Sequence, residues 1–327
     1  MQSAAGDYII CASERQRMLW LGWLEAAGRV NPLTYDQDPT LRALIDTVPT
    51  GVPASPPLQT RPLVRGVVPG IGQEDPLLVW GGGVWNWLDP LTLIEAVGRL
   101  VAKHPNLRLY FPGSRHPYQA FVPDMAMRQA AVELSEERGL NGMHVFWGDW
   151  VPYEDRQNYL LEANLGCSMH FETVESHFSF RTRVLDYIWA GLPMIVTRGD
   201  AASEWVERYR LGVVVDYRDV EGVVAAIDRL LVVPRSDFAA SFERARQARS
   251  WEECARPLVR FCQNPRRAAD RELDRDWAQG PDRAEVRALE REVERLRETV
   301  AGYERGRFMR LMAWLHRVRQ KARARLG

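Results

Sequence analysis

Charged side chains interrupt an otherwise apolar stretch, FSFRTRVLDYIWAGLPMIVTRGD. The stretch reads as a helix that carries Arg181, Arg183 and Asp186 near its start. A carboxylate in the first turns of a helix is favoured by the helix dipole, which accounts for Asp186. The same dipole disfavours cations at that end, so it does not account for the two arginines. We therefore predict that an anionic ligand lies opposite Arg181 and Arg183.

Three glycines follow an apolar run in VWGGGVWNWLDPLTL. Asp89 and Pro90 are typical of a helix start, with aspartate as the cap and proline in the first turn. Glycines let backbone amides approach a ligand closely, and a helix N-terminus favours an anion. Phosphate contact at Gly82 and Gly83 is one interpretation, and a plain tight turn is the other. The two tryptophans that flank Asn86 either stack on a base or sugar or pack in the core.

Two further loops carry polar side chains. YFPGSRHPYQAF ends an apolar run and then places Arg115 and His116 either at the rim of a cleft or in solvent. HFETVESHF offers Glu172 and Glu175 just before the two arginines.

The elements that would position these residues are short apolar runs that alternate with helix-length segments. The predicted strands are 77–81, 107–111, 144–148, 165–170, 192–196 and 211–216. Such runs between helices are typical of a parallel sheet covered on both faces. The predicted fold class is therefore α/β, with a doubly wound parallel sheet that binds ligands beyond the carboxyl ends of its strands.

The rest of the chain divides around this sheet. Residues 1–48 read as the last strand–helix unit of a preceding domain whose earlier part is missing, and the Pro- and Gly-rich residues 49–76 read as a linker. The sheet domain is predicted at 77–264, a second linker at 265–281, and a helical segment at 282–327. Apolar residues in the helical segment recur at alternating spacings of three and four, which predicts coiled-coil self-association over 286–303. They are Val286, Leu289, Val293, Leu296, Val300 and Tyr303.

Charge is unevenly distributed along the 327 residues, although the formal net charge is zero. Residues 305–327 hold eight Arg or Lys and no Asp or Glu, whereas the others carry 35 basic and 43 acidic side chains. A basic helix with an apolar stripe is typical of binding to an anionic membrane surface. A solvated extension and a continuation of the coiled coil are the alternatives. We expect no nucleic-acid partner.

Cysteine usage and hydropathy bear on location. The four cysteines lack metal-type spacing and predict no disulfide framework. No uncharged apolar run reaches about 18 residues, and the first residues lack the pattern of a secretory signal. These features predict a cytoplasmic protein, peripheral on the inner face of the cell membrane if the tail binds there.

Several segments resemble the GT-B glycosyltransferases of family 4 (group 1). LDYIWAGLPMI is similar to a family segment whose acidic residue, here Asp186, accepts hydrogen bonds from the donor ribose. VWGGG, VFWGDWVPYEDRQNYLLEANLGCSMH and LGVVVDYRDVEGVVAAI resemble other family segments, in the family's order. The resemblance covers roughly residues 6–232. It implies the C-terminal donor-binding half of a GT-B fold, with most of the N-terminal domain missing.

Two departures from the family affect the site. The family's first glutamate falls on Phe178, so Glu175 or Glu172 would have to replace it. The glycine-rich loop lacks the family's basic residues, so Arg181 and Arg183 would supply the charge for the diphosphate.

The resemblance thus implies transfer of a sugar from a nucleoside-diphosphate sugar to a hydroxyl of a glycan or lipid-linked acceptor. It also implies a role in cell-surface polysaccharide biosynthesis and transfer with retention. Glu175 and Arg183 are the predicted catalytic residues, and no metal or cofactor is expected. The predicted donor-binding residues are Gly82, Gly83, Asn86, Arg115, Arg181 and Asp186. Two alternatives remain: a GT-B sugar-nucleotide epimerase, and a non-catalytic nucleotide-sugar-binding or scaffold fragment.

Overall fold

A computed structural model describes residues 5–113, 125–272 and 283–305. The chain forms two units, of which one runs from Gly6 to Ala269 and the other contains the last helix, α13 (Arg283–Arg305). The first unit holds a six-stranded sheet and a smaller two-stranded sheet.

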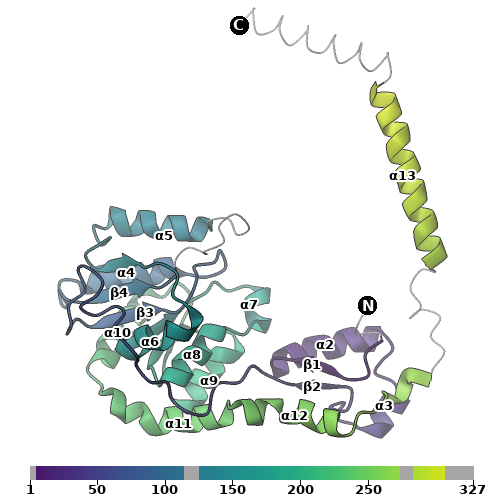
Figure 1. Ribbon diagram of the computed structural model, residues 1–327, viewed down its shortest axis with the longest axis horizontal. Helices are drawn as coiled ribbons and strands as arrows, with labels where there is room; N and C mark the ends of the chain where they lie inside the picture. The colour runs from purple at the N-terminus through teal and green to yellow at the C-terminus, as the bar shows by residue number, and fades with distance from the viewer. Residues whose placement is uncertain (1–4, 114–124, 273–282, 306–327) are drawn as a thin grey trace, which may run out of the picture. The chain divides into compact units, whose positions relative to one another are not determined.

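The six-stranded sheet is parallel throughout, in the order β5-β4-β3-β6-β7-β8. Two of its strands, β3 and β4, are labelled in Figure 1. Its strands are β3 (Leu77–Trp80), β4 (Arg108–Phe111), β5 (Val145–Trp147), β6 (Leu165–Ser168), β7 (Met194–Thr197) and β8 (Gly212–Val215). All six predicted strands are confirmed, and so is the doubly wound fold. The order reverses between β3 and β6, which is where doubly wound sheets bind ligands.

Helices cover both faces of this sheet. One layer consists of α4 (Pro90–Leu100), α5 (Ala126–Glu137) and α10 (Val220–Leu231). The other consists of α6 (Arg156–Glu162), α8 (Thr182–Ala190), α9 (Ala201–Tyr209) and α11 (Ala239–Ala248). The short helix α7 (Val174–Phe178) lies between β6 and α8 in the chain.

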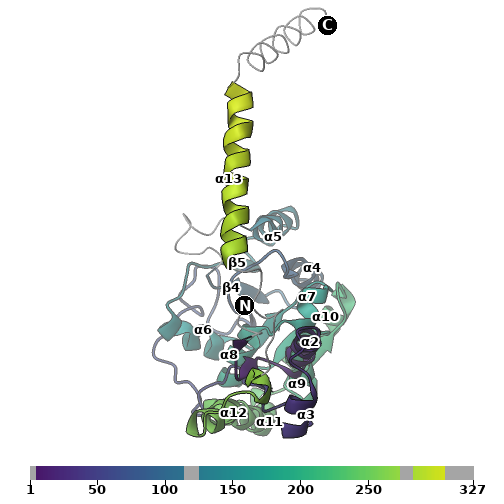
Figure 2. The same ribbon diagram turned by 90° about the vertical axis from the view of Figure 1, so that its right-hand side faces the viewer.

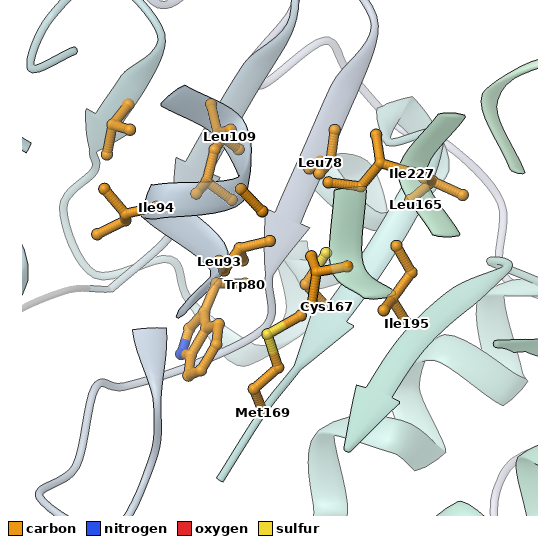
Figure 3. Close-up of a cluster of buried hydrophobic side chains, with 14 of the residues drawn as sticks. Leu78, Trp80, Leu93, Ile94, Leu109, Leu165, Cys167, Met169, Ile195 and Ile227 are labelled. Carbon is orange, nitrogen blue, oxygen red and sulfur yellow. The ribbon is translucent and has the colours of Figure 1, made fainter. Parts of the chain in front are cut away.

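The alternation of side chains along each strand builds one core on each face. Leu78 and Trp80 of β3 belong to the core beneath α4 and α10, while Leu77 and Val79 belong to the opposite core. Figure 3 shows the first of these cores, in which strand side chains meet Leu93 and Ile94 of α4. Because both faces are buried, the strands are almost wholly apolar.

Tyr187 ties β3 to β6 near their carboxyl ends. Its hydroxyl accepts a hydrogen bond from the Gly81 amide at 2.7 Å and donates to the Cys167 carbonyl at 2.9 Å. A Cβ atom at Gly81 would lie 2.9 Å from the Tyr187 ring, and one at Gly166 would lie 2.8 Å from it. The two strands therefore hold the ring in a slot that only glycine leaves open.

The smaller sheet pairs β1 (Ile9–Cys11) with β2 (Ile45–Thr47) in parallel, with α2 (Glu14–Ala26) and α3 (Pro32–Gln37) between them. Ser13 caps α2, since its side chain accepts a hydrogen bond from the Gln16 amide. The end of α12 (Trp251–Gln263) packs here, since Phe261 stacks on Tyr8 with ring centroids 4.5 Å apart.

Residues 49–76 form no helix or strand apart from a single bridge at Val52, as a linker predicts. They are nevertheless fixed to the sheet domain. The Glu162 carboxylate accepts hydrogen bonds from three consecutive backbone amides, 63–65, and Asn158 accepts from the Thr60 amide. Val64 is fully buried in the core on the α8 side of the sheet.

Helix α13 is one uninterrupted helix (Figure 2). Four residues of the predicted seam, Leu289, Val293, Leu296 and Val300, are 47–59% exposed. The side chains at 286 and 303, and the basic segment 306–327, lie outside the described part of the structure.

Candidate functional site

The sheet brings two distant segments together at the carboxyl ends of β3 and β6. Leu88 and His170 form a backbone bridge, and the Asp89 amide donates to the Met169 carbonyl at 3.1 Å. The glycine-rich loop after β3 therefore lies beside the segment that leads from β6 into α7. This is the reversal point of the strand order.

A cavity of about 240 Å³ opens between these segments. The glycine-rich loop, the end of β6, α7 and the first turn of α8 all contribute to its wall. The lining residues are Trp85, Trp87, Leu88, His170, Thr173, Glu175, Ser176, Ser179, Phe180, Arg181, Thr182 and Arg183. The predicted catalytic pair, Glu175 and Arg183, thus shares one cavity.

Arg183 is a half-buried cation with no carboxylate partner among the described residues. Its Nη2 donates to the Gly83 carbonyl at 3.0 Å, and its guanidinium lies over the Trp80 ring, 5.0 Å from the centroid. Its Nη1 is buried and has no hydrogen-bond partner among the residues that the structure describes. Burial lowers the pKa of Arg183 to about 10, so the side chain remains charged at neutral pH. A buried, unsatisfied guanidinium nitrogen on a cavity wall is suited to an anion.

Arg181 has a different environment, although it is only two residues away. It is buried in a two-pronged ion pair with Asp200, with nitrogen–oxygen distances of 2.6 and 2.7 Å. It also donates to the Ser168 and Thr197 carbonyls. Its charge is already neutralised and its donors are occupied, so the predicted anion contact is left to Arg183.

Comparison with known proteins identifies the part of the chain that builds this cavity. Residues 75–232 match the family model described as "Glycosyl transferases group 1". This part of the chain is a group 1 glycosyl transferase domain. The resemblance to GT-B glycosyltransferases is confirmed. No curated protein matches the chain in sequence.

Solved GT-B structures share the fold over about four fifths of this chain. A sucrose-phosphate synthase from Thermosynechococcus elongatus superposes with a TM-score of 0.52 at 18% identity, over 79% of this chain and 58% of that one. A UDP-forming α,α-trehalose-phosphate synthase from Burkholderia xenovorans gives 0.58 at 14%, over 80% and 62%. WaaG, a glycosyltransferase involved in lipopolysaccharide biosynthesis, gives 0.52 at 18%, over 80% and 61%. The chain thus spans about three fifths of the length of these structures.

Asp186 does not line the cavity of the transferase domain. Its Oδ1 accepts a hydrogen bond from Nε of Arg156 at 3.0 Å, and its side chain is 34% exposed. Burial raises the pKa of Asp186 above its ordinary value, while the hydrogen bond from Arg156 acts in the opposite direction. The guanidinium of Arg156 also stacks on Tyr153 and Trp189. Asp186 therefore belongs to a second cluster, in which Arg156 joins Asp186 and Trp189 of α8 to Tyr153.

The remaining predicted site residues lie on the glycine-rich loop, on α7 or outside the described residues. Gly82 has a φ of +109°, which favours glycine, and Gly83 meets Arg183 through its carbonyl. The side chain of Asn86 accepts from the Met127 amide at 3.0 Å, so it fixes the loop to α5. Glu175 is exposed on α7, and Arg115 lies outside the described residues.

Helix α2 holds α7 in place. Arg15 donates to the His177 carbonyl at 3.2 Å and pairs with Glu204 at 2.6 Å, while Gln16 donates to the Phe178 carbonyl at 2.9 Å. The strand–helix unit before the linker thus contacts the segment that carries Glu175.

His170 is a candidate that sequence reasoning missed. It is 2% exposed and lines the cavity, and its Nε2 has no partner among the described residues. Thr197 Oγ1 accepts from the His170 amide and lies 2.6 Å from Nδ1, so its own hydroxyl proton is free to bond to Nδ1. Burial and the nearby Arg181 charge lower the pKa of His170 to about 4, so the ring is neutral at pH 7. With the Thr197 hydroxyl donating to Nδ1, the ring proton lies on Nε2. The only sequence signal was a polar residue directly after a buried strand.

Within the described residues, no group of three or more His, Cys, Asp or Glu side chains is placed to hold a metal ion.

Proposed function

We propose that this chain binds a nucleoside-diphosphate sugar and transfers the sugar to a hydroxyl of a glycan or lipid-linked acceptor. The observation that carries the proposal is the buried Nη1 of Arg183, which has no hydrogen-bond partner among the described residues and lies on a cavity at the reversal point of a group 1 glycosyl transferase sheet. Loss of a nucleoside diphosphate builds negative charge on the leaving oxygen. Arg183 supplies a preorganised donor for that charge, with Glu175 facing the sugar from α7.

Within this proposal Asp186 accepts from the ribose hydroxyls. The side chain shares its carboxylate with Arg156 and is one-third exposed, so we expect Asp186→Ala to weaken UDP or GDP binding by about tenfold. Because the ribose is common to nucleotide and nucleoside, uridine or guanosine should lose affinity by the same factor. Asp186→Asn should lose less, since its amide oxygen still accepts.

Isothermal titration calorimetry of the full chain with each nucleotide and its nucleoside measures these factors. Glu154→Ala is the matched control, because it removes a carboxylate from the neighbouring segment. Unchanged affinity for all four ligands in a folded Asp186→Ala protein would remove Asp186 from the donor site.

We also propose that α13 pairs with a second copy of itself. Valine stands at the first position of three heptads and leucine at the fourth position of the first two, a pattern that favours parallel dimers. Wild-type protein should sediment as a dimer at tens of micromolar, whereas Leu289→Lys with Leu296→Lys should sediment as a monomer in analytical ultracentrifugation. Two lysines on the outer face, Ala288→Lys with Ala301→Lys, should leave the dimer intact. Identical sedimentation of all three proteins would contradict the pairing.

Location is the last part of the proposal. None of the helices in the described ranges is long and apolar enough to cross a membrane. We propose that the basic residues 305–327 bind the anionic inner face of the cell membrane, near a lipid-linked acceptor, with about 1 kcal/mol per cation at the surface. The stereochemical outcome is proposed to be retention.

A further inference from the structure

The two tryptophans of the glycine-rich loop form a stacked platform. The rings of Trp85 and Trp87 are parallel to within 6°, with centroids 5.4 Å apart, and both line the cavity. Trp87 is 52% exposed. Since Trp85 covers one face of the Trp87 ring, the exposed surface includes the other face and the ring edge. The tryptophan platform (Trp85 and Trp87) therefore presents a large apolar surface to the cavity.

Hydrogen bonds and a backbone bridge hold the loop that carries the tryptophan platform. The Asn86 side chain fixes the loop to the Met127 amide, and the Trp87 carbonyl accepts from the Phe171 amide at 3.4 Å. Next in the chain, Leu88 forms the bridge to His170. A ligand that stacks here does not have to order the loop first, which favours binding.

Polar groups of complementary type surround the platform. With the Thr197 hydroxyl donating to Nδ1, the buried Nε2–H of His170 is a donor that has no partner among the described residues. The exposed carboxylate of Glu175 is an acceptor. An apolar wall with a few placed polar groups is typical of a small-molecule site.

We infer that the tryptophan platform binds a pyranose ring, with His170 and Glu175 bonding to its hydroxyl groups. The C–H bonds on one face of a pyranose carry partial positive charge and pack on the negative face of an aromatic ring. The hydroxyls project from the ring edge, where each can accept from an N–H and donate to a carboxylate. This inference rests on the proposed function, which supplies the sugar donor and the acceptor. The pyranose is the sugar of the donor or a sugar of the acceptor.

The experiment separates the sugar from the nucleotide. Calorimetry on the full chain compares UDP with UDP-glucose and GDP with GDP-mannose for wild type, Trp87→Ala and Trp87→Phe. Saturation-transfer NMR with methyl α-glucopyranoside and methyl α-mannopyranoside, added to UDP- or GDP-saturated protein, tests free glycosides. Trp23→Ala is the matched control, because Trp23 is 55% exposed on α2 and does not line the cavity.

For a donor sugar, we expect Trp87→Ala to lower nucleotide-sugar affinity roughly 2- to 12-fold with the affinity for the bare nucleotide unchanged. For an acceptor sugar, the free-glycoside signal should vanish in Trp87→Ala while the nucleotide-sugar affinity stays the same. In both cases Trp87→Phe should retain most of the sugar-dependent binding, and Trp23→Ala should leave it unchanged.

Two results would overturn the inference. One is that Trp87→Ala changes neither the nucleotide-sugar affinity nor the free-glycoside signal. The other is an equal loss of UDP and uridine affinity, which would assign a nucleobase to the platform. Failure of every nucleotide to bind wild type would instead count against the proposed function, and a Trp87-dependent glycoside signal would still support the pyranose site.

Discussion

Arg181→Met is expected to lower the free energy of unfolding by about 3–5 kcal/mol at pH 7, because it leaves the Asp200 carboxylate buried without its partner. The melting temperature should fall by roughly 6–20 °C. The double variant Arg181→Met with Asp200→Asn should recover most of the loss, since no uncompensated charge remains and Asn still caps α9.

The sign of the pH dependence follows from Asp200. Burial raises the pKa of Asp200, but the charge and hydrogen bonds of Arg181 outweigh burial and hold it below its ordinary value. The pair's contribution is therefore complete above the unfolded pKa of about 3.9 and is lost as the pH falls through the lower folded pKa. In Arg181→Met the charge and hydrogen bonds of Arg181 are lost, and only weaker contributions such as the Ser203 amide still oppose burial. The folded pKa of Asp200 therefore rises, so the deficit should shrink between pH 7 and pH 5.

Urea unfolding of wild type and Arg181→Met at several pH values measures the difference in their free energies of unfolding. Arg198→Met is the control, because Arg198 and Asp216 form an exposed ion pair with a contribution of about 0–1 kcal/mol. If Arg181→Met unfolds like the control, the buried pair does not stabilise the fold.

Arg183→Ala should weaken UDP or GDP binding roughly 10- to 150-fold, since a hydrogen bond to a charged group contributes about 1.5–3 kcal/mol. Uridine and guanosine, which lack phosphate, should bind as they do to wild type. No carboxylate among the described residues depends on Arg183 for its charge. Its buried Nη1 has no hydrogen-bond partner among those residues, which is itself unfavourable. The melting temperature of the unliganded variant should therefore be unchanged or higher.

Calorimetry and thermal unfolding of the same preparations test both statements. Arg99→Ala is the control for the loss of an arginine, because Arg99 is exposed near the end of α4. Equal losses for nucleotide and nucleoside, or a lower melting temperature with unchanged UDP affinity, would make Arg183 a structural residue.

The contrast between Arg181 and Arg183 shows where sequence reasoning ends. The six strands followed from apolar runs of strand length between helices, because burial on both faces leaves that pattern in the sequence itself. The carboxyl-edge location of the site followed from the fold. Which arginine is free depends on Asp200, which lies 19 residues further along the chain and reaches Arg181 only through the β7–α9 turn. Spacing contains no information about that pairing.

The same limit applies to Asp186 and His170. Asp186 lies three residues after Arg183 on the same helix, so the sequence predicted one shared surface, but Arg156 from α6 draws its carboxylate into another cluster. His170 ends an apolar run, and a single histidine there is as compatible with core packing as with a ligand contact. Only the missing partner of its Nε2 distinguishes the two.

The slot that holds Tyr187 restricts how this sheet can change during evolution. An alanine at Gly81 or Gly166 collides with the ring, and a smaller side chain at 187 unties β3 from β6 and leaves a void. Each single replacement is therefore harmful, whereas a bulkier residue at 166 together with a smaller one at 187 restores the packed volume. We expect strong non-additivity among the three positions and, in related chains, joint replacement of the tyrosine and its facing glycine.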